Sequence, residues 1–132
     1  MFTLGVSDHV MIAHSFADVF FGPAQRLHGA TYAMELEVRA PDLNPHDVVM
    51  DIGAMRTILR AVLAEIDYHN LDEHPAFAGR LSTTERVAEY VANEASRRLA
   101  RLKADAAPVP GSVVRVVARE SPVAYAAFER PL

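Results

Sequence analysis

The sequence predicts an α+β fold in which one antiparallel sheet carries two helices on one face. Apolar and polar residues alternate over Thr31–Arg39, as in a strand with one wet face. Apolar residues recur at helical spacing over Ala54–Ile66 and again in the segment that begins at Ser82. Two β-rich runs, Val113–Arg119 and Val123–Glu129, close the chain around a Ser-Pro turn. The predicted order is therefore β-β-α-α-β-β.

Composition sets the limits on the class of protein. The 132 residues, of which 51% are apolar, predict one domain over residues 1–132 with an ordinary core. The chain has no cysteine, which excludes a disulfide, a thiolate nucleophile and a sulfur ligand. A net charge of −4, with scattered lysines and arginines, argues against nucleic acid as a partner. No stretch approaches the roughly 18 apolar residues of a membrane span, and no basic leader is present, so we expect a cytoplasmic protein without a membrane partner.

The first half of the chain predicts two strands joined by a loop. Residues Phe2–His14 are rich in β-formers and contain a glycine, which predicts a long strand with or without a bulge. Ser15–Leu27 contains Gly-Pro and predicts a loop. Its phenylalanines are expected to tuck beneath it: Phe16, Phe20 and Phe21. The apolar face of the next strand predicts core residues: Tyr32, Met34, Leu36 and Val38.

The second half predicts a helix pair and a hairpin. A loop over Asn70–Leu81 separates the Ala54–Ile66 helix from a second helix, which opens at Ser82–Glu85 and ends near Arg101 or Lys103. Such a unit leaves two open sheet edges and one uncovered sheet face. An oligomer would resolve this by continuing the sheet into a neighbouring subunit.

Three segments, in order along the chain, resemble those of a known family. They are R-L-H-G-A-T-Y at Arg26–Tyr32, I-D-Y-H-N-L-D at Ile66–Asp72 and L-S-T-T-E-R-V-A-E-Y at Leu81–Tyr90. The sequence resembles the 6-pyruvoyl tetrahydropterin synthase family, which includes the 6-carboxytetrahydropterin synthases. The resemblance implies the tunnelling fold, in which subunits join edge to edge into barrels. It also implies a homo-oligomer, usually a hexamer, with active sites between subunits.

The resemblance implies a zinc ion held by three histidines, but only two are present. His14 and His28 occupy two of the ligand positions, and the third position holds Ala30. Because residues 28 and 30 lie on the same face of a strand, Thr31 points away and cannot replace the missing ligand. His9 has the opposite parity to His14. Two imidazoles alone would bind zinc weakly, so we expect no cofactor and disfavour zinc.

The resemblance also implies a proton-abstracting cysteine and an aspartate–histidine pair that tunes it. Ala24 stands at the cysteine position, and Asp67 is followed by Tyr68 where the family has histidine. A tyrosine with a pKa of about 10 is a poor base at neutral pH. His69 is adjacent, but its side chain should diverge from that of its neighbour. Asp67 and His69, together with His28, remain the candidates for any residual acid–base catalysis.

The residues that the resemblance implies for pterin binding are present: Thr83, Thr84, Glu85 and Glu120. A pterin carries a ring N–H and an amino group side by side, and one carboxylate can accept both hydrogens. Each such bond is worth about 1.5–3 kcal/mol, or roughly one to two decades of affinity. Glu120 is the best candidate for this contact. Because guanine and deazaguanine present the same edge, the residues predict a ring type and not one compound.

Each of these residues also has a plainer local interpretation. Thr83 or Thr84 can cap a helix, and Glu120 can be a solvated turn residue. The histidines at positions 14 and 28 can be interior side chains bonded to carbonyl groups. Asp67 can cap the loop that follows the first helix. Tyr32 belongs to the core by periodicity and has no predicted site role.

The sequence thus predicts a divergent family member that binds a pterin-like, or purine- or deazapurine-like, ligand between subunits. It predicts that the zinc- and cysteine-dependent synthase activity is absent. Whether the chain is an enzyme stays open, because it resembles carbon–carbon or carbon–oxygen lyases without their cysteine, relay histidine and third ligand. Two alternatives are an active synthase with a rearranged zinc site and a non-catalytic ring-forming scaffold.

Overall fold

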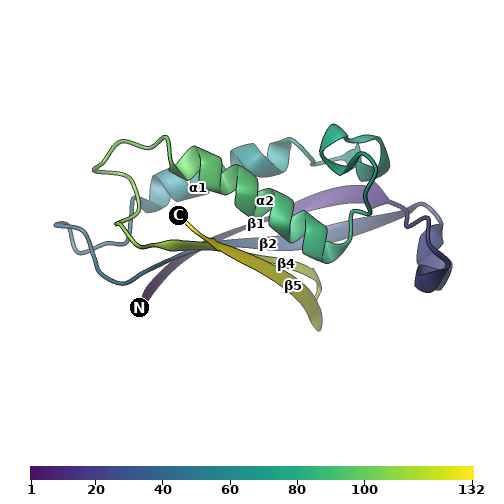
Figure 1. Ribbon diagram of the computed structural model, residues 1–132, viewed down its shortest axis with the longest axis horizontal. Helices are drawn as coiled ribbons and strands as arrows, with labels where there is room; N and C mark the ends of the chain where they lie inside the picture. Colours follow the sequence, from purple (N-terminus) through teal and green to yellow (C-terminus); the bar gives the residue numbers. More distant parts are fainter.

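The computed structural model describes residues 1–132, which form a five-stranded sheet with two helices on one face (Figure 1). The sheet order is β3-β1-β2-β4-β5. The strands are β1 (Phe2–His14), β2 (His28–Ala40), β3 (His69–Asn70), β4 (Val113–Ser121) and β5 (Ala124–Pro131). The helices are α1 (Ile52–Ala64) and α2 (Thr84–Leu99), with short 3-10 helices η1 (Val19–Gln25), η2 (Leu71–Glu73) and η3 (Pro75–Phe77). The α+β prediction is confirmed, with β3 as an additional strand that pairs parallel to β1.

The hairpin of β1 and β2 organises the sheet. Its pairing runs without interruption from Phe2 opposite Ala40 to His14 opposite His28, so β1 contains no bulge. Opposite residues of an antiparallel pair project to the same side of the sheet. The register therefore places the two imidazoles together at one end, where β1 finishes and β2 begins.

The core lies between the inner face of the sheet and the two helices. The four residues predicted for this face of β2 are no more than 1% exposed: Tyr32, Met34, Leu36 and Val38. They pack in one cluster with Met55 and Leu59 of α1 and with Val87 and Val91 of α2. Burial of each large apolar side chain contributes about 1.5–3 kcal/mol, so this cluster holds the two layers together.

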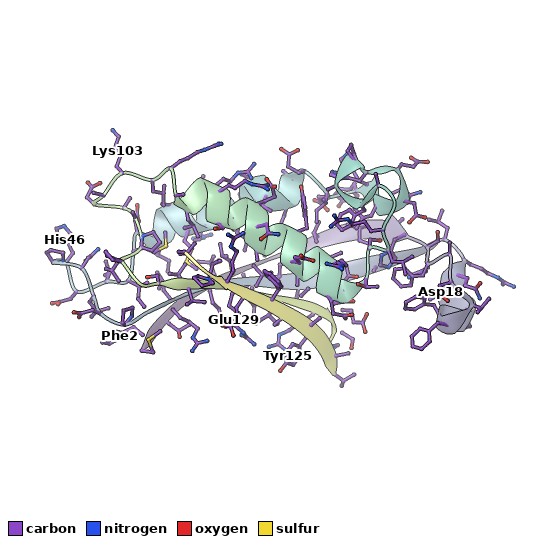
Figure 2. The ribbon with its side chains drawn as sticks, viewed as in Figure 1. Phe2, Asp18, His46, Lys103, Tyr125 and Glu129 are labelled. Atoms are coloured by element: carbon purple, nitrogen blue, oxygen red, sulfur yellow. The ribbon has the colours of Figure 1, made fainter.

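The loop between β1 and β2 differs in part from the prediction. Phe16 is buried, whereas Phe20 is 84% exposed, so the expectation that it tucks under the loop is wrong. The side chain of Asp18 accepts a hydrogen bond from the Phe20 N–H and starts η1. Gly22, with φ 54°, turns the chain within η1. Figure 2 shows Asp18 at the far end of the molecule, where this loop projects.

Side-chain caps set where the two long helices begin. Asp51 accepts from the Gly53 N–H at 3.0 Å, and α1 therefore begins at Ile52, two residues earlier than predicted. Thr83 accepts from the Arg86 N–H at 3.3 Å and caps α2. The second helix ends at Leu99, short of the predicted end near Arg101 or Lys103. Neither helix is long and apolar enough to cross a membrane.

The face of the sheet that lies away from the helices is uncovered and carries charged residues. Glu37, Glu35 and Glu129 pair with Arg115, Arg119 and Arg39, respectively, at N···O distances of 3.0, 3.3 and 3.1 Å. Figure 2 shows Tyr125 and Glu129 on this side of the ribbon. Partly exposed pairs of this kind add little to stability. The uncovered face and the free edge of β5 agree with the unpaired edges predicted for a single chain.

Candidate functional site

A cleft of about 640 Å³ opens at the end of the sheet where β1 ends, β2 begins and α2 begins. In Figure 1 this end lies at the right, where η1 projects beyond the sheet. The cleft is lined by His14, Phe16, Phe21, Ala24, His28, Gly29, Ala30, Thr31, Tyr32, Thr83, Thr84, Glu85, Glu120 and Ser121. The structure thus brings together every residue predicted for ligand binding and both predicted metal ligands. Asp67 and His69 are not among the lining residues.

A chain of hydroxyl and carboxylate groups crosses one side of the cleft. Thr84 Oγ1 donates to Glu120 Oε2 at 3.3 Å, and the Tyr32 hydroxyl lies 3.4 Å from Thr84 Oγ1. Because Thr84 has one hydroxyl hydrogen, which goes to the carboxylate, Tyr32 is the donor to Thr84. Burial raises the pKa of Tyr32 above its usual 10.0, although the hydrogen bond to Thr84 acts in the opposite direction, so the hydroxyl keeps its proton at neutral pH.

This arrangement separates the roles of the residues at the start of α2. Thr83 is the helix cap, so its plainer interpretation is confirmed. Thr84 instead turns its hydroxyl to Glu120, which is exposed but lies in the cleft and not in a solvated turn apart from it. Glu120 Oε1 makes no hydrogen bond within the chain and is free to accept one. Glu85 is exposed in the first turn of α2, where its charge is favourable at the positive helix end.

Two imidazoles also line the cleft. His14 Nδ1 lies 2.9 Å from the Ser82 carbonyl oxygen, and His28 Nδ1 lies 2.8 Å from the Arg26 carbonyl oxygen. Carbonyl oxygens only accept, so both Nδ1 atoms carry hydrogen. The ring centroids are 4.6 Å apart with an interplanar angle of 63°. The interpretation as interior histidines bonded to carbonyl groups is confirmed for His14, whereas His28 makes the carbonyl bond but is only partly buried.

His14 is 2% exposed, and its surroundings disfavour the charged ring. Burial lowers the pKa of His14 below its usual 6.5, and the neighbouring His28 lowers it further. The Ser82 carbonyl, Asp72 and Glu120 act in the opposite direction without reversing the shift. His14 is therefore a neutral imidazole at pH 7.

The residues present do not fit the zinc site that the resemblance implies. No group of three or more histidine, aspartate and glutamate side chains in the chain lies close enough together to hold a metal ion. Ala30 lines the cleft on the same strand face as His28 but offers no ligand atom. His9 is exposed beside Asp8, on the face that His14 does not share, and cannot supply the third imidazole.

Asp67 and His69 lie at the edge of the sheet. Asp67 Oδ1 accepts from the Met11 N–H at 3.0 Å, and the Tyr68 N–H donates to the Met11 carbonyl at 2.7 Å. His69 is exposed, and its Nδ1 donates to the Asp67 carbonyl at 2.7 Å. Tyr68 is 81% exposed and has φ 57°. Within one chain, Asp67 and Tyr68 hydrogen-bond to the edge of β1. The catalytic role of Asp67 and His69 stays a prediction.

Sequence reasoning missed the contacts of three residues that line the cleft or support residues beside it. Tyr32 is a core residue, as predicted, but also a hydrogen-bond donor to Thr84. A tyrosine among apolar core positions needs a hydrogen-bond partner for its hydroxyl, and its presence in the apolar face of β2 could have indicated such a contact. Ser82 is buried and holds His14, and Asp72 accepts from the Ser15 N–H at 3.0 Å and from the Ser15 hydroxyl. No periodic pattern reveals these two contacts.

Comparison with known proteins bears on the whole chain. A family model described as 6-pyruvoyl tetrahydropterin synthase matches residues 3–131. The 6-pyruvoyl tetrahydropterin synthase of Caenorhabditis elegans has a similar structure, with a TM-score of 0.79 and 21% identity over 98% of this chain and 95% of that one. The 6-pyruvoyl tetrahydropterin synthase of Plasmodium vivax has a TM-score of 0.77 and 19% sequence identity, and the match covers 98% of both chains. An uncharacterized protein from Wolinella succinogenes has a TM-score of 0.65 and 12% sequence identity. That match covers 96% of this chain and 97% of the other.

These comparisons differ in what they support. At identities below 25%, the solved structures support the fold alone. No curated protein matches the chain. Two further structures of the Plasmodium vivax protein replace a glutamate that is described as a catalytic residue.

The state of His14 predicts how stability depends on pH. Its pKa is lower in the folded chain than in the unfolded chain, so the unfolded chain binds more protons between the two values. This contribution to stability is complete above about pH 6.5 and is lost as the pH falls toward the folded-state value. Urea unfolding from about pH 8 to about pH 5 should show the decline, and His14→Gln should flatten it. An unchanged slope in the variant would contradict the assignment to His14.

The missing third ligand predicts a gain of metal binding. Ala30→His would place an imidazole on the strand face of His28, so zinc affinity should rise at least about tenfold, measured by competition with a chromophoric chelator. Thr31→His is the matched control, since that side chain leaves from the opposite face, and it should bind no better than the parent. If the parent protein binds one zinc ion per chain tightly, the conclusion that its residues do not fit a zinc site is wrong.

Proposed function

The chain belongs to the 6-pyruvoyl tetrahydropterin synthase family, and on that premise we propose that its cleft binds a pterin-like ring without zinc- and thiol-dependent synthase activity. The observation that carries the proposal is the hydrogen bond from Thr84 to Glu120 inside the cleft. This bond orients a carboxylate on the wall of a ligand-sized hollow. Membership of the family supplies the class of ligand.

Glu120 has the chemistry that the edge of a pterin requires. Thr84 occupies one carboxylate oxygen at 3.3 Å and leaves the other free, so the carboxylate is held in place and can still accept two hydrogens. The ring N–H and the adjacent amino group of a pterin donate in parallel, which makes the contact charge-assisted and directional. Guanine-like and deazaguanine-like rings present the same pair of donors and belong to the same ligand class.

The remaining walls suit a flat heterocycle. A volume of about 640 Å³ lies in the range of roughly 300–1,000 Å³ that is typical of small-molecule sites. Phe16 and Phe21 lie together on one side, with ring centroids 4.7 Å apart. Aromatic side chains give a planar ligand contact area at little cost in conformational freedom.

The loss of synthase chemistry follows from what the cleft does not contain. Ala24 lines the cleft at the position that the resemblance gives to the cysteine, and the chain has no thiol anywhere. Ala30 leaves the metal position one ligand short. Proton abstraction by a thiolate next to a Lewis acid has no residues here to perform it.

A lyase with a carboxylate base is the second candidate function. A glutamate is described as a catalytic residue of the Plasmodium vivax relative, so a missing thiol alone does not exclude proton transfer. Glu85 lines the cleft and makes no hydrogen bond or ion pair within the chain. It is therefore the carboxylate available for acid–base work once Glu120 holds the ring.

We also propose that the protein assembles into a homo-oligomer, a hexamer in the pattern of the tunnelling fold, with ligand bound between subunits. The support is the free edge of β5 and the uncovered face of the sheet. A neighbouring subunit would close the open side of the cleft. It would also bring its own Asp67 and His69 toward the ligand, which would account for their absence from the cleft lining within one chain.

Replacement of Glu120 tests the binding proposal. Calorimetric titration with pterins and with guanine-like rings should show binding to the parent protein, and Glu120→Gln should weaken it by roughly ten- to a hundredfold, because one acceptor oxygen and the charge are lost. Glu73→Gln removes an exposed carboxylate outside the cleft and should bind like the parent. No heat with any of these rings would reject the proposal and favour a non-catalytic scaffold.

Assembly is measured separately. Sedimentation velocity at micromolar concentrations should show a discrete species of six chains, because paired edges remove the exposed backbone groups of β5. A well-behaved monomer under the same conditions would refute the assembly proposal and leave the binding proposal to be judged by titration.

A further inference from the structure

The end of the molecule opposite the cleft carries a second hollow. It is a groove of about 660 Å³ between the start of β1 and the segment that joins β2 to α1. Figure 2 shows Phe2 and His46 at this end and Asp18 at the other. The part of β1 from Leu4, in the groove, to His14, in the cleft, spans about 33 Å at roughly 3.3 Å per strand residue. The groove is therefore separate from the candidate ligand site.

The surface of this groove is apolar and open to solvent. Phe2, Val48 and Ile52 are each between 42% and 50% exposed. Leu4 and Leu43 are partly buried and line the same hollow. Single exposed apolar residues are common, but several in one hollow form a patch of the kind that marks an interaction surface. The groove thus offers contact area to apolar side chains.

Hydrogen bonds within the segment between β2 and α1 hold this surface in shape. The Asn44 side-chain oxygen accepts from the Val48 N–H at 3.3 Å, and the Asn44 N–H donates to the Val48 carbonyl at 2.9 Å. Between them, Asp47 takes the left-handed conformation with φ 59°. The next residues, Val49 and Met50, are buried in the core. Because Val48 is fixed at the surface before a partner arrives, binding there loses little conformational entropy.

Carboxylates lie beside the apolar surface, and no lysine or arginine lines the groove. Asp47, Asp51 and Asp105 are lining residues, and the only other ionisable one is His46. Asp51 caps α1, whereas Asp47 and Asp105 are exposed and form no ion pair within the chain. These two carboxylates come from different segments, one before α1 and one after α2. An apolar surface with unpaired carboxylates is complementary to a segment that carries both apolar and basic side chains.

We propose that this groove docks a short segment of a partner protein in which apolar side chains are flanked by lysine or arginine. The apolar side chains enter the hollow against Phe2, Val48 and Ile52, and the basic groups pair with Asp47 and Asp105. The same carboxylates repel phosphate groups, which disfavours nucleic acid and an anionic membrane as the occupant. This site goes beyond ligand binding at the cleft and does not depend on it.

Two synthetic peptides test the chemistry of the occupant. One is an amphipathic peptide of leucine and lysine, about 14 residues long, and the other has glutamate in place of every lysine. Fluorescence anisotropy at low salt should show that the full chain binds the lysine peptide at least about tenfold tighter. Added salt should narrow the difference, because exposed charge pairs are screened. If the chain binds neither peptide, or binds both equally, the proposal is wrong.

Variants of the groove test where the lysine peptide binds. Asp47→Asn combined with Asp105→Asn should weaken binding by about fivefold or more, because two charge pairs are lost. Asparagine tolerates the left-handed conformation at position 47, so the fold is kept. Val48→Ser should weaken binding by about threefold or more, because it removes apolar contact area.

Matched controls carry the same changes outside the groove. Glu65→Gln combined with Glu73→Gln alters the net charge equally, and Val123→Ser removes an exposed valine from the turn between β4 and β5. Both controls should bind the lysine peptide like the parent. An equal loss in the controls, or no loss in the groove variants, would overturn the proposal.

Two further measurements assign the groove to another occupant if the proposal is wrong. Sedimentation velocity without peptide should be the same for the parent and for Val48→Ser, and a smaller assembly in the variant would show that a second copy of the chain covers the groove. Vesicles that contain phosphatidylserine should not bind the parent. Binding that Val48→Ser abolishes would assign the groove to a membrane surface.

Discussion

The continuous pairing of β1 with β2 is the constraint on which the rest of the structure depends. Thirteen consecutive residue pairs fix which side chains face the helices and which face outward. Because side chains alternate along a strand, a slip of one residue would move Tyr32 and Met34 out of the core and carry His28 to the wrong face. The same register that buries the apolar residues therefore also assembles the cleft. Stability and site geometry have one common cause in this hairpin.

The start of α2 shows how a short polar segment can hold several elements at once. Ser82, Thr83 and Thr84 are consecutive, and their side chains reach the end of β1, the backbone of α2 and the end of β4, respectively. Ser82 and Thr83 precede α2, which begins at Thr84, and Thr83 is extended, so the three side chains leave the chain in different directions and can reach three different partners. This short segment thereby holds both His14 and Glu120, which line the same cleft. Capping the helix requires only Thr83, so the contacts of Ser82 and Thr84 serve the cleft and not the cap.

Local patterns predicted most of the fold and only part of the site. The alternation in β2 and the helical spacing in α1 and α2 are repeated signals that survive single exceptions, so these elements were predicted within a few residues. β3 has two residues and exists only through its pairing with β1, so no periodic signal marks it. The site residues were assigned through the family resemblance, whereas their contacts were not. The pairing of His14 with Ser82 spans 68 positions and depends on how the helix lies on the sheet.

The way in which His14 and His28 are anchored has a consequence for the protein inside a cell. Their orientations come from peptide carbonyl groups and from the ring of Phe16, all of which belong to the polypeptide. The two rings therefore take their orientations when the chain folds. A newly made chain in a cell would present the same pair of imidazoles before it meets any ligand.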